Sequence, residues 1–209
     1  KQPFDSLKDV MPVASVSRSG IVLVANVSNP AKDFRGLVDW LKERKGKTSY
    51  ATYSAGTVSH YSGAILSDTL GLDMQHIPFA GSPPALQNLL GGQVDIMFDG
   101  MLTSMPMIKG GKLRPYAVTG NTRSRQLPDV PTMTELGYPQ AQFVGWIGLI
   151  GPAKLPPEEL SKIQAAMKKA MSTPAMQQKL VDAGLEPEVN VDSAALAKET
   201  REMYERNAE

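Results

Sequence analysis

The chain has 209 residues, enough for one large domain or two small ones with a substantial hydrophobic core. Hydrophobic residues make up 42% and charged residues 21%, which is ordinary globular usage and argues against a disordered or fibrous chain. With 22 Lys and Arg against 21 Asp and Glu, the net charge is +1. A chain this close to neutral lacks the excess of basic residues that nucleic-acid binding requires.

Residue types that several kinds of chemistry require are missing or scarce. The chain has no cysteine, which excludes disulfides, thiolate zinc sites and cysteine nucleophiles. Only His60 and His76 offer imidazole, and their spacing does not match a helical metal pair, so we expect no metal and no cofactor. The longest strongly apolar run, residues 21–25, is far too short to span a bilayer.

The first elements alternate between strand and helix. A strand is expected over residues 21–27, because the apolar run at 21–25 does not alternate with polar residues, which is typical of a strand buried on both faces of a parallel sheet. Apolar residues then recur with helical spacing over 34–41, in a helix that Asp33 can cap. A strand over 48–53 precedes a helix over 57–70, which a glycine ends.

The alternation continues toward the middle of the chain. A strand over 74–79 precedes a helix in which Ser82 is the expected N-cap and Pro83 the first residue. A further strand, helix and strand are expected over 94–98, 101–108 and 113–119. Such alternation predicts parallel βαβ units, so the predicted fold class is α/β.

The remainder of the chain is less regular at first. Residues 121–131 are polar and contain prolines, which we interpret as a surface loop. A strand is expected over 143–150, with Trp146 either packed at a domain junction or lining a pocket. From Pro156 onward the chain is mainly helical, and the last helix is expected to begin at Asp192.

The most informative stretch for function is residues 52–60, where small and hydroxyl side chains join a strand to a helix. A glycine allows close approach to the backbone, the first helical amides lack internal partners, and the helix dipole favours negative charge. The stretch therefore fits an anion site, and it fits a capped connection without a ligand equally well. It matches neither the P-loop nor the dinucleotide-binding pattern.

Catalytic chemistry has weak support in the sequence. Ser59 and His60 are adjacent, but neighbours on a helix point in different directions and no GxSxG surrounds the serine, so a hydrolase is the least favoured alternative. We expect His60 to bond to backbone or solvent and His76 to be structural. Asp95 and Asp99 flank a strand, and Asp99 at its C-terminal end is better placed for a ligand than for catalysis.

The order of these segments resembles the extracytoplasmic receptors of tripartite tricarboxylate transporters, often called the Bug family. Each matching stretch is weakly specific alone, but together they follow the family's order over nearly the whole chain. They are residues 4–9, 50–60, 77–85, 90–99, 111–119, 127–137 and 146–157.

The resemblance implies the type II periplasmic-binding-protein fold, in which the chain crosses twice between two α/β domains. Residues 1–23 and 144–209 would belong to domain 1, and residues 24–143 would form domain 2. Family members normally begin with a longer segment that carries a glycine-rich ligand loop, so domain 1 is expected to be incomplete here. Apolar helix faces would then be uncovered, and self-association of the chain is an expected outcome.

The function implied by the resemblance is capture of a small carboxylate in the periplasm, without catalysis. The ligand would be a di- or tricarboxylate, an aromatic acid or an acidic amino acid, and the precursor would carry a signal peptide. The implied partners are the membrane components of a tripartite tricarboxylate transporter. The alternative is a sensory ligand-binding domain of similar fold that signals through a partner.

The resemblance also indicates which residues would contact the ligand. They occupy the family's second-domain ligand loop, a turn that lines the cleft, and the end of a strand that faces it. These residues are Thr52, Gly56, Thr57, Val58, Ser59, Phe79, Ala80 and Asp99. The family's loop usually has a second glycine where this chain has Ser54 and Ala55, so the ligand preference stays open.

Overall fold

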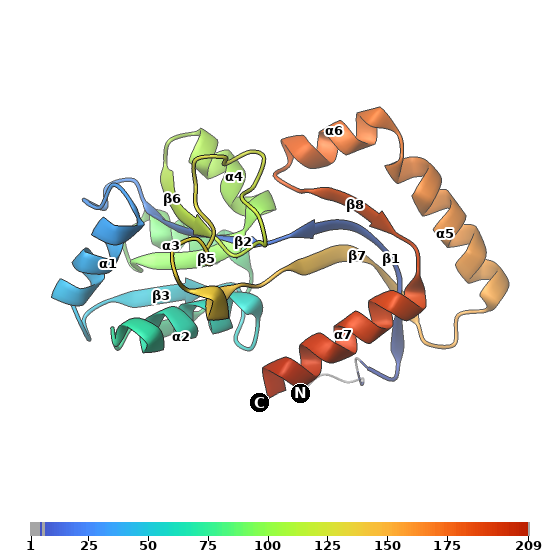
Figure 1. Cartoon of the computed structure of the whole chain (residues 1–209), viewed down its shortest axis with the longest axis horizontal. Coiled ribbons are helices and arrows are strands. Elements are labelled where there is room, and N and C mark those ends of the chain that lie inside the picture. Colours follow the sequence, from blue (N-terminus) through green and yellow to red (C-terminus); the bar gives the residue numbers. More distant parts are fainter. Residues whose placement is uncertain (1–4, 6, 209) are drawn as a thin grey trace. The chain divides into compact units, whose positions relative to one another are not determined.

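The computed structural model describes residues 5 and 7–208 (Figure 1). Contacts within the chain divide it into two compact units. The first unit is Lys1–Arg18 with Gly145–Glu209, and the second unit is Ser19–Val144. The chain therefore crosses between the units after Arg18 and after Val144. The crossings expected from the sequence are after residues 23 and 143.

The second unit is built on a five-stranded mixed sheet. Its strand order is β4 (Gln75–Pro78), β3 (Ser49–Thr52), β5 (Ile96–Gly100), β2 (Ile21–Asn26) and β6 (Leu113–Val118). Strand β3 runs parallel to β4 and β5, but β2 runs antiparallel to both of its neighbours. The α/β class is confirmed and the purely parallel sheet is wrong, because a continuous apolar run reports burial on both faces and not strand direction.

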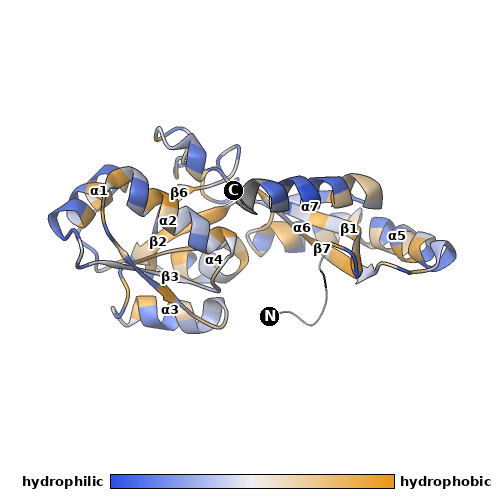
Figure 2. Ribbon diagram, turned by 90° about the horizontal axis from the view of Figure 1, so that it is seen from below, coloured by the Kyte–Doolittle hydropathy of each residue, from blue (hydrophilic) through white to orange (hydrophobic). Residues whose placement is uncertain are grey.

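Helices cover both faces of this sheet. On one face lie α1 (Phe34–Glu43) and α2 (Val58–Leu70), and on the other lie α3 (Ser82–Leu90) and α4 (Met101–Lys109). Leu23 of β2 packs in the core beneath α1 and α2, while Val22 and Val24 pack in the core beneath α3 and α4. In Figure 2, α1 and α3 are banded orange and blue, as amphipathic helices in such a layer should be. The predicted two-sided burial of β2 is confirmed.

Two of the helix ends in this unit follow their local sequence signals. The side chain of Asp33 accepts a 2.8 Å hydrogen bond from the amide of Gly36 and caps α1 as expected. Helix α2 begins after Thr57 and ends at Gly71, which has the left-handed conformation with φ of 60°.

The expected cap of α3 is wrong. Ser82 is the first residue of the helix, and the N-cap is Gly81, which has a φ of 107° and offers no side chain. The Ser82 hydroxyl instead donates to the carboxylate of Asp99 over 2.6 Å. The hydrogen bond of this serine therefore goes to a residue distant in sequence and not to the backbone of its own helix.

The first unit has a three-stranded sheet with the order β7 (Gly145–Pro152), β1 (Val10–Ser19) and β8 (Pro187–Asn190). Its helices are α5 (Pro157–Met171), α6 (Pro174–Asp182) and α7 (Ser193–Ala208). Strands β1 and β8, which are antiparallel, were not expected from the sequence. Strand β1 buries Ser15 and Ser17 completely, so it shows neither an apolar run nor an apolar alternation.

Two other expectations concern this unit. Helix α7 follows Asp192, whose side chain accepts a 3.0 Å hydrogen bond from the amide of Ala195, so the expected start is confirmed. Trp146 lies on β7 and is partly buried. No helix within residues 5 and 7–208 is both long and apolar enough to cross a membrane.

Candidate functional site

Three helices begin at one edge of the sheet in the second unit. Strands β3, β4 and β5 run in the same direction, so their C-terminal ends lie at one edge, and α2, α3 and α4 follow these ends. None of the three helices has a side-chain cap, in contrast to α1. The edge therefore gathers backbone amides and positive helix-dipole ends, which favour an anion.

Asp99 lies inside this edge and is completely buried. Its carboxylate accepts hydrogen bonds from the hydroxyls of Ser82 at 2.6 Å, Thr103 at 2.7 Å and Ser104 at 2.7 Å. The side chain thereby joins the starts of α3 and α4, and the predicted ligand contact at this residue stays a prediction.

The start of α2 has no such internal carboxylate. Gly56 is exposed with a φ of 73°, and a Cβ there would have no atom within 4 Å. The Thr57 hydroxyl does not cap the helix and instead donates to the carbonyl of Ser54 over 2.8 Å, which closes the loop on itself. The amide of Gly56 donates to Nδ1 of His60 over 3.2 Å, so it is not a free donor for a ligand. Ser54 and Ala55 of this loop are exposed as well, whereas the amide of Ser59, further into the helix, bonds to the phenol of Tyr53.

The turn after β4 is joined to this loop through the backbone. The amide of Phe79 donates to the carbonyl of Thr52, and the amide of Gly81 donates to the carbonyl of Tyr53, both over 2.9 Å. Phe79 is partly buried and Ala80 is exposed. These bonds place the two predicted turn residues beside the loop that leads into α2.

Two other predicted residues are buried in the base of the site. Thr52 Oγ1 lies 2.8 Å from Nε2 of His76, and the Ser59 hydroxyl donates to the carbonyl of Phe98 over 2.5 Å. Ser59 and His60 thus have different partners, which does not support the hydrolase alternative. The expected backbone bond of His60 and the structural role of His76 are both confirmed.

Tyr53 belongs to the same edge, although the sequence interpretation did not select it. Burial, and then the negative charge of Asp99, raise the pKa of its phenol, while the amide of Ser59 and the hydroxyl of Thr57 act in the opposite direction. The phenol therefore lies near both Asp99 and the start of α2. An aromatic residue at a strand end is usually a core residue, so spacing alone gave no functional signal.

The structure thus brings all of the predicted ligand residues to one edge of the second unit, but they differ in exposure. Gly56 and Ala80 are exposed, Thr57, Val58 and Phe79 are partly buried, and Thr52, Ser59 and Asp99 are buried. The part accessible to a ligand is therefore the start of α2 with the adjoining turn.

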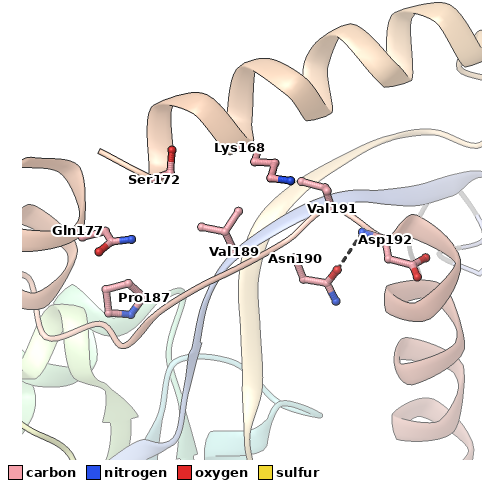
Figure 3. Close-up of a pocket in the computed structure, with 8 residues that line it drawn as sticks. All are labelled: Lys168, Ser172, Gln177, Pro187, Val189, Asn190, Val191 and Asp192. Carbon is pink, nitrogen blue, oxygen red and sulfur yellow. Dashed lines mark hydrogen bonds between the residues drawn. The ribbon is translucent and has the colours of Figure 1, made fainter. Parts of the chain in front are cut away.

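A separate pocket lies in the first unit, between α5, α6 and β8 (Figure 3). Its volume is about 390 Å³, and Lys168 and Asp192 are its charged lining residues. Asp192 already caps α7, and its amide donates to the side chain of Asn190 over 2.8 Å. We assign no function to this pocket. Across the described residues, no group of three metal-ligating side chains could hold an ion.

Comparison with known proteins defines the class first: the fold is that of periplasmic binding proteins. One solved structure, described as a periplasmic transporter, is 35% identical with a TM-score of 0.93, over 99% of this chain and 69% of that one. MatC from Rhodopseudomonas palustris, solved with bound malate, is 31% identical with a TM-score of 0.88, over 99% of this chain and 71% of its own.

The sequence pattern of the tripartite tricarboxylate transporter family receptors matches residues 1–209. The chain belongs to this receptor family, as the resemblance predicted. A curated relative from Pseudomonas sp. strain P51, the UPF0065 protein in the tcbD-tcbE intergenic region, is 31% identical over 91% of this chain. The match covers 58% of that relative, so this chain spans well under two thirds of its length.

Proposed function

We propose that this chain supplies the carboxylate-binding edge of a periplasmic solute receptor that serves a tripartite tricarboxylate transporter. The observation that carries the proposal is the uncapped, accessible start of α2 at Gly56–Val58, beside a second uncapped helix start whose anion is the internal Asp99. One carboxylate of the ligand would meet the first-turn amides of α2.

The chemistry of the edge suits reversible capture. The donors proposed for the ligand are backbone amides, because the serine and threonine hydroxyls described above bond within the protein, and no arginine is among the residues that we place there. Such donors hold a carboxylate by oriented dipoles, without the strong bidentate bonds that arginine forms. A receptor that must release its cargo to a membrane carrier needs this kind of binding. The family relative with bound malate supports a small dicarboxylate as the ligand.

Replacing Gly56 by valine tests the placement of the ligand. The glycine has a φ of 73° and open space where a Cβ would point, so valine would crowd the approach to the start of α2 and strain the loop. We expect malate affinity, measured by titration calorimetry, to fall at least about tenfold, which corresponds to roughly 1.4 kcal/mol.

Gly71→Val is the matched control for this variant. Gly71 lies at the other end of the same helix, with a φ of 60° and equally open space, so valine adds similar strain away from the site. We expect Gly71→Val to bind malate as the parent chain does. Equal loss of affinity in both variants, or no loss in Gly56→Val, would refute the placement.

A further inference from the structure

The loop that leads into α2 rests on a stack of aromatic rings. The imidazoles of His60 and His76 are stacked, with 4.0 Å between ring centroids and 14° between planes. Tyr50 of β3 stacks on His76 at 5.1 Å, and Tyr61 stacks on His60 at 5.9 Å. Tyr50 also lies 6.4 Å from the His60 ring, so this tyrosine contacts both imidazoles and limits how far either can turn.

Each histidine of the stack also holds one end of the loop. His76 is hydrogen-bonded to Thr52, the last residue of β3, and His60 accepts the amide of Gly56 at Nδ1. An imidazole nitrogen that accepts an amide hydrogen carries no proton, so this bond requires the His60 tautomer with its proton on Nε2. The loop from strand to helix is therefore fixed at both ends by the stacked pair.

The titratable groups that face the pair come from three elements. Tyr50 faces it from β3, His76 is on β4, and Tyr61 follows His60 on α2. Burial, and then the charge of Asp68, raise the pKa of Tyr50, so its phenol stays neutral at physiological pH. Burial, and then repulsion from the charged form of His60, lower the pKa of His76. Simultaneous protonation of His60 and His76 is therefore unfavourable in this stack.

We propose that His60 is a positioning residue of the carboxylate site, whose uncharged ring holds Gly56 in place and releases the loop on taking up a proton at Nδ1. This inference rests on the proposed function and adds a pH-dependent control to the same site. A proton on Nδ1 turns the acceptor into a donor that points at the amide of Gly56, so the bond breaks. The loop then loses its anchor on α2, and the approach to the helix start changes.

Nuclear magnetic resonance of the ¹⁵N-labelled chain tests this role without any ligand. Between pH 8 and pH 5, the Gly56 amide signal should move together with the ring nitrogens of His60, and at pH 8 Nδ1 should show the unprotonated signature. Gly71 provides an internal reference, since its amide donates to the backbone carbonyl of Asp68 and contacts no histidine.

Two variants separate the acceptor from the ring. His60→Asn keeps an acceptor oxygen near the position of Nδ1 and cannot be protonated in this range, so its Gly56 signal should stay constant with pH. His60→Phe keeps an aromatic ring and loses the acceptor, so Gly56 should show the released signal at every pH. At pH 8 malate should bind His60→Phe several-fold more weakly than His60→Asn.

The results separate the positioning role of His60 from the proposed function. A Gly56 signal that ignores the titration of His60, or a His60 ring with its proton on Nδ1 at pH 8, would overturn the positioning role. The same result for His60→Asn and His60→Phe would also overturn it. If Gly56 follows His60 while no variant binds malate or another dicarboxylate, the positioning of the loop is upheld and the proposed function fails.

Discussion

We propose that Asp99 positions two helix starts of the candidate site. Its buried carboxylate accepts hydroxyls from Ser82 on α3 and from Thr103 and Ser104 on α4, so it fixes two helix starts relative to each other. A buried carboxylate that accepts three hydrogen bonds is stabilised, whereas a buried carboxylate without donors is costly. The start of α2 has no such carboxylate partner, and we propose it as the place of the external carboxylate.

Removing this carboxylate should destabilise the second unit. Asp99→Ala removes the acceptor of the Ser82 and Ser104 hydroxyls, while Thr103 keeps a bond to the carbonyl of Gly100. We expect a loss of about 1–3 kcal/mol in the free energy of unfolding, measured with urea. Asp95→Ala is the control, because Asp95 is only partly buried and bonds to Ser49 alone, so its loss should be smaller. An Asp99→Ala variant as stable as the parent would contradict the positioning role.

The residue scale also shows where sequence interpretation reached its limit. The anion site at residues 52–60 could be proposed from the sequence because glycine, hydroxyls and a helix start are local signals. The burial of Thr52, Ser59 and Asp99 could not be predicted from the sequence, because it depends on partners from other elements. Spacing along the chain does not show which side of an element faces the core.

At the scale of elements, the start of α1 and the end of α2 were predictable, while the cap of α3 and the direction of β2 were not. The predictable ends are those at which Asp33 and Gly71 act on their own turns. The reversal of β2 follows from its pairing with β5 and β6, which lie far along the chain. Strand β1 was missed because its core positions include serines.

The packing of α2 on the sheet depends on one missing side chain. A Cβ at Gly63 would lie 2.3 Å from the ring of Tyr50, which is buried and belongs to the stack under the site. Gly63→Ala gains up to about 1 kcal/mol of helix propensity but overpacks at a cost of about 1–3 kcal/mol. We expect a net loss of stability in urea unfolding.

The clash can be separated from other effects of the alanine by a double-mutant cycle. Tyr50→Leu removes the ring that the new methyl group would meet, so Gly63→Ala should cost less in that background. If Gly63→Ala costs the same with leucine as with tyrosine at residue 50, contact with the ring is not the cause.

At the scale of the whole molecule, the first unit exposes much apolar surface. Ile147, Leu149 and Ile150 of β7 are 46%, 40% and 55% exposed, and α5 has no buried residue. We predict that this surface makes the 209-residue chain self-associate.

Sedimentation experiments check this prediction. Leu149→Lys should reduce self-association of the chain, and Leu102→Lys, at an exposed position of the second unit, should not. A chain that stays monomeric, or equal effects of the two variants, would contradict the prediction.

We propose above all that a ligand carboxylate binds at the first turn of α2. The most direct measurement is titration of the ¹⁵N-labelled chain with malate, because chemical shifts detect weak binding and report each amide separately. We predict that the amides of Thr57 and Val58 shift most, with smaller changes at Phe79 and Ala80. Saturable shifts centred on other elements, with the first turn of α2 unchanged, would contradict the claim.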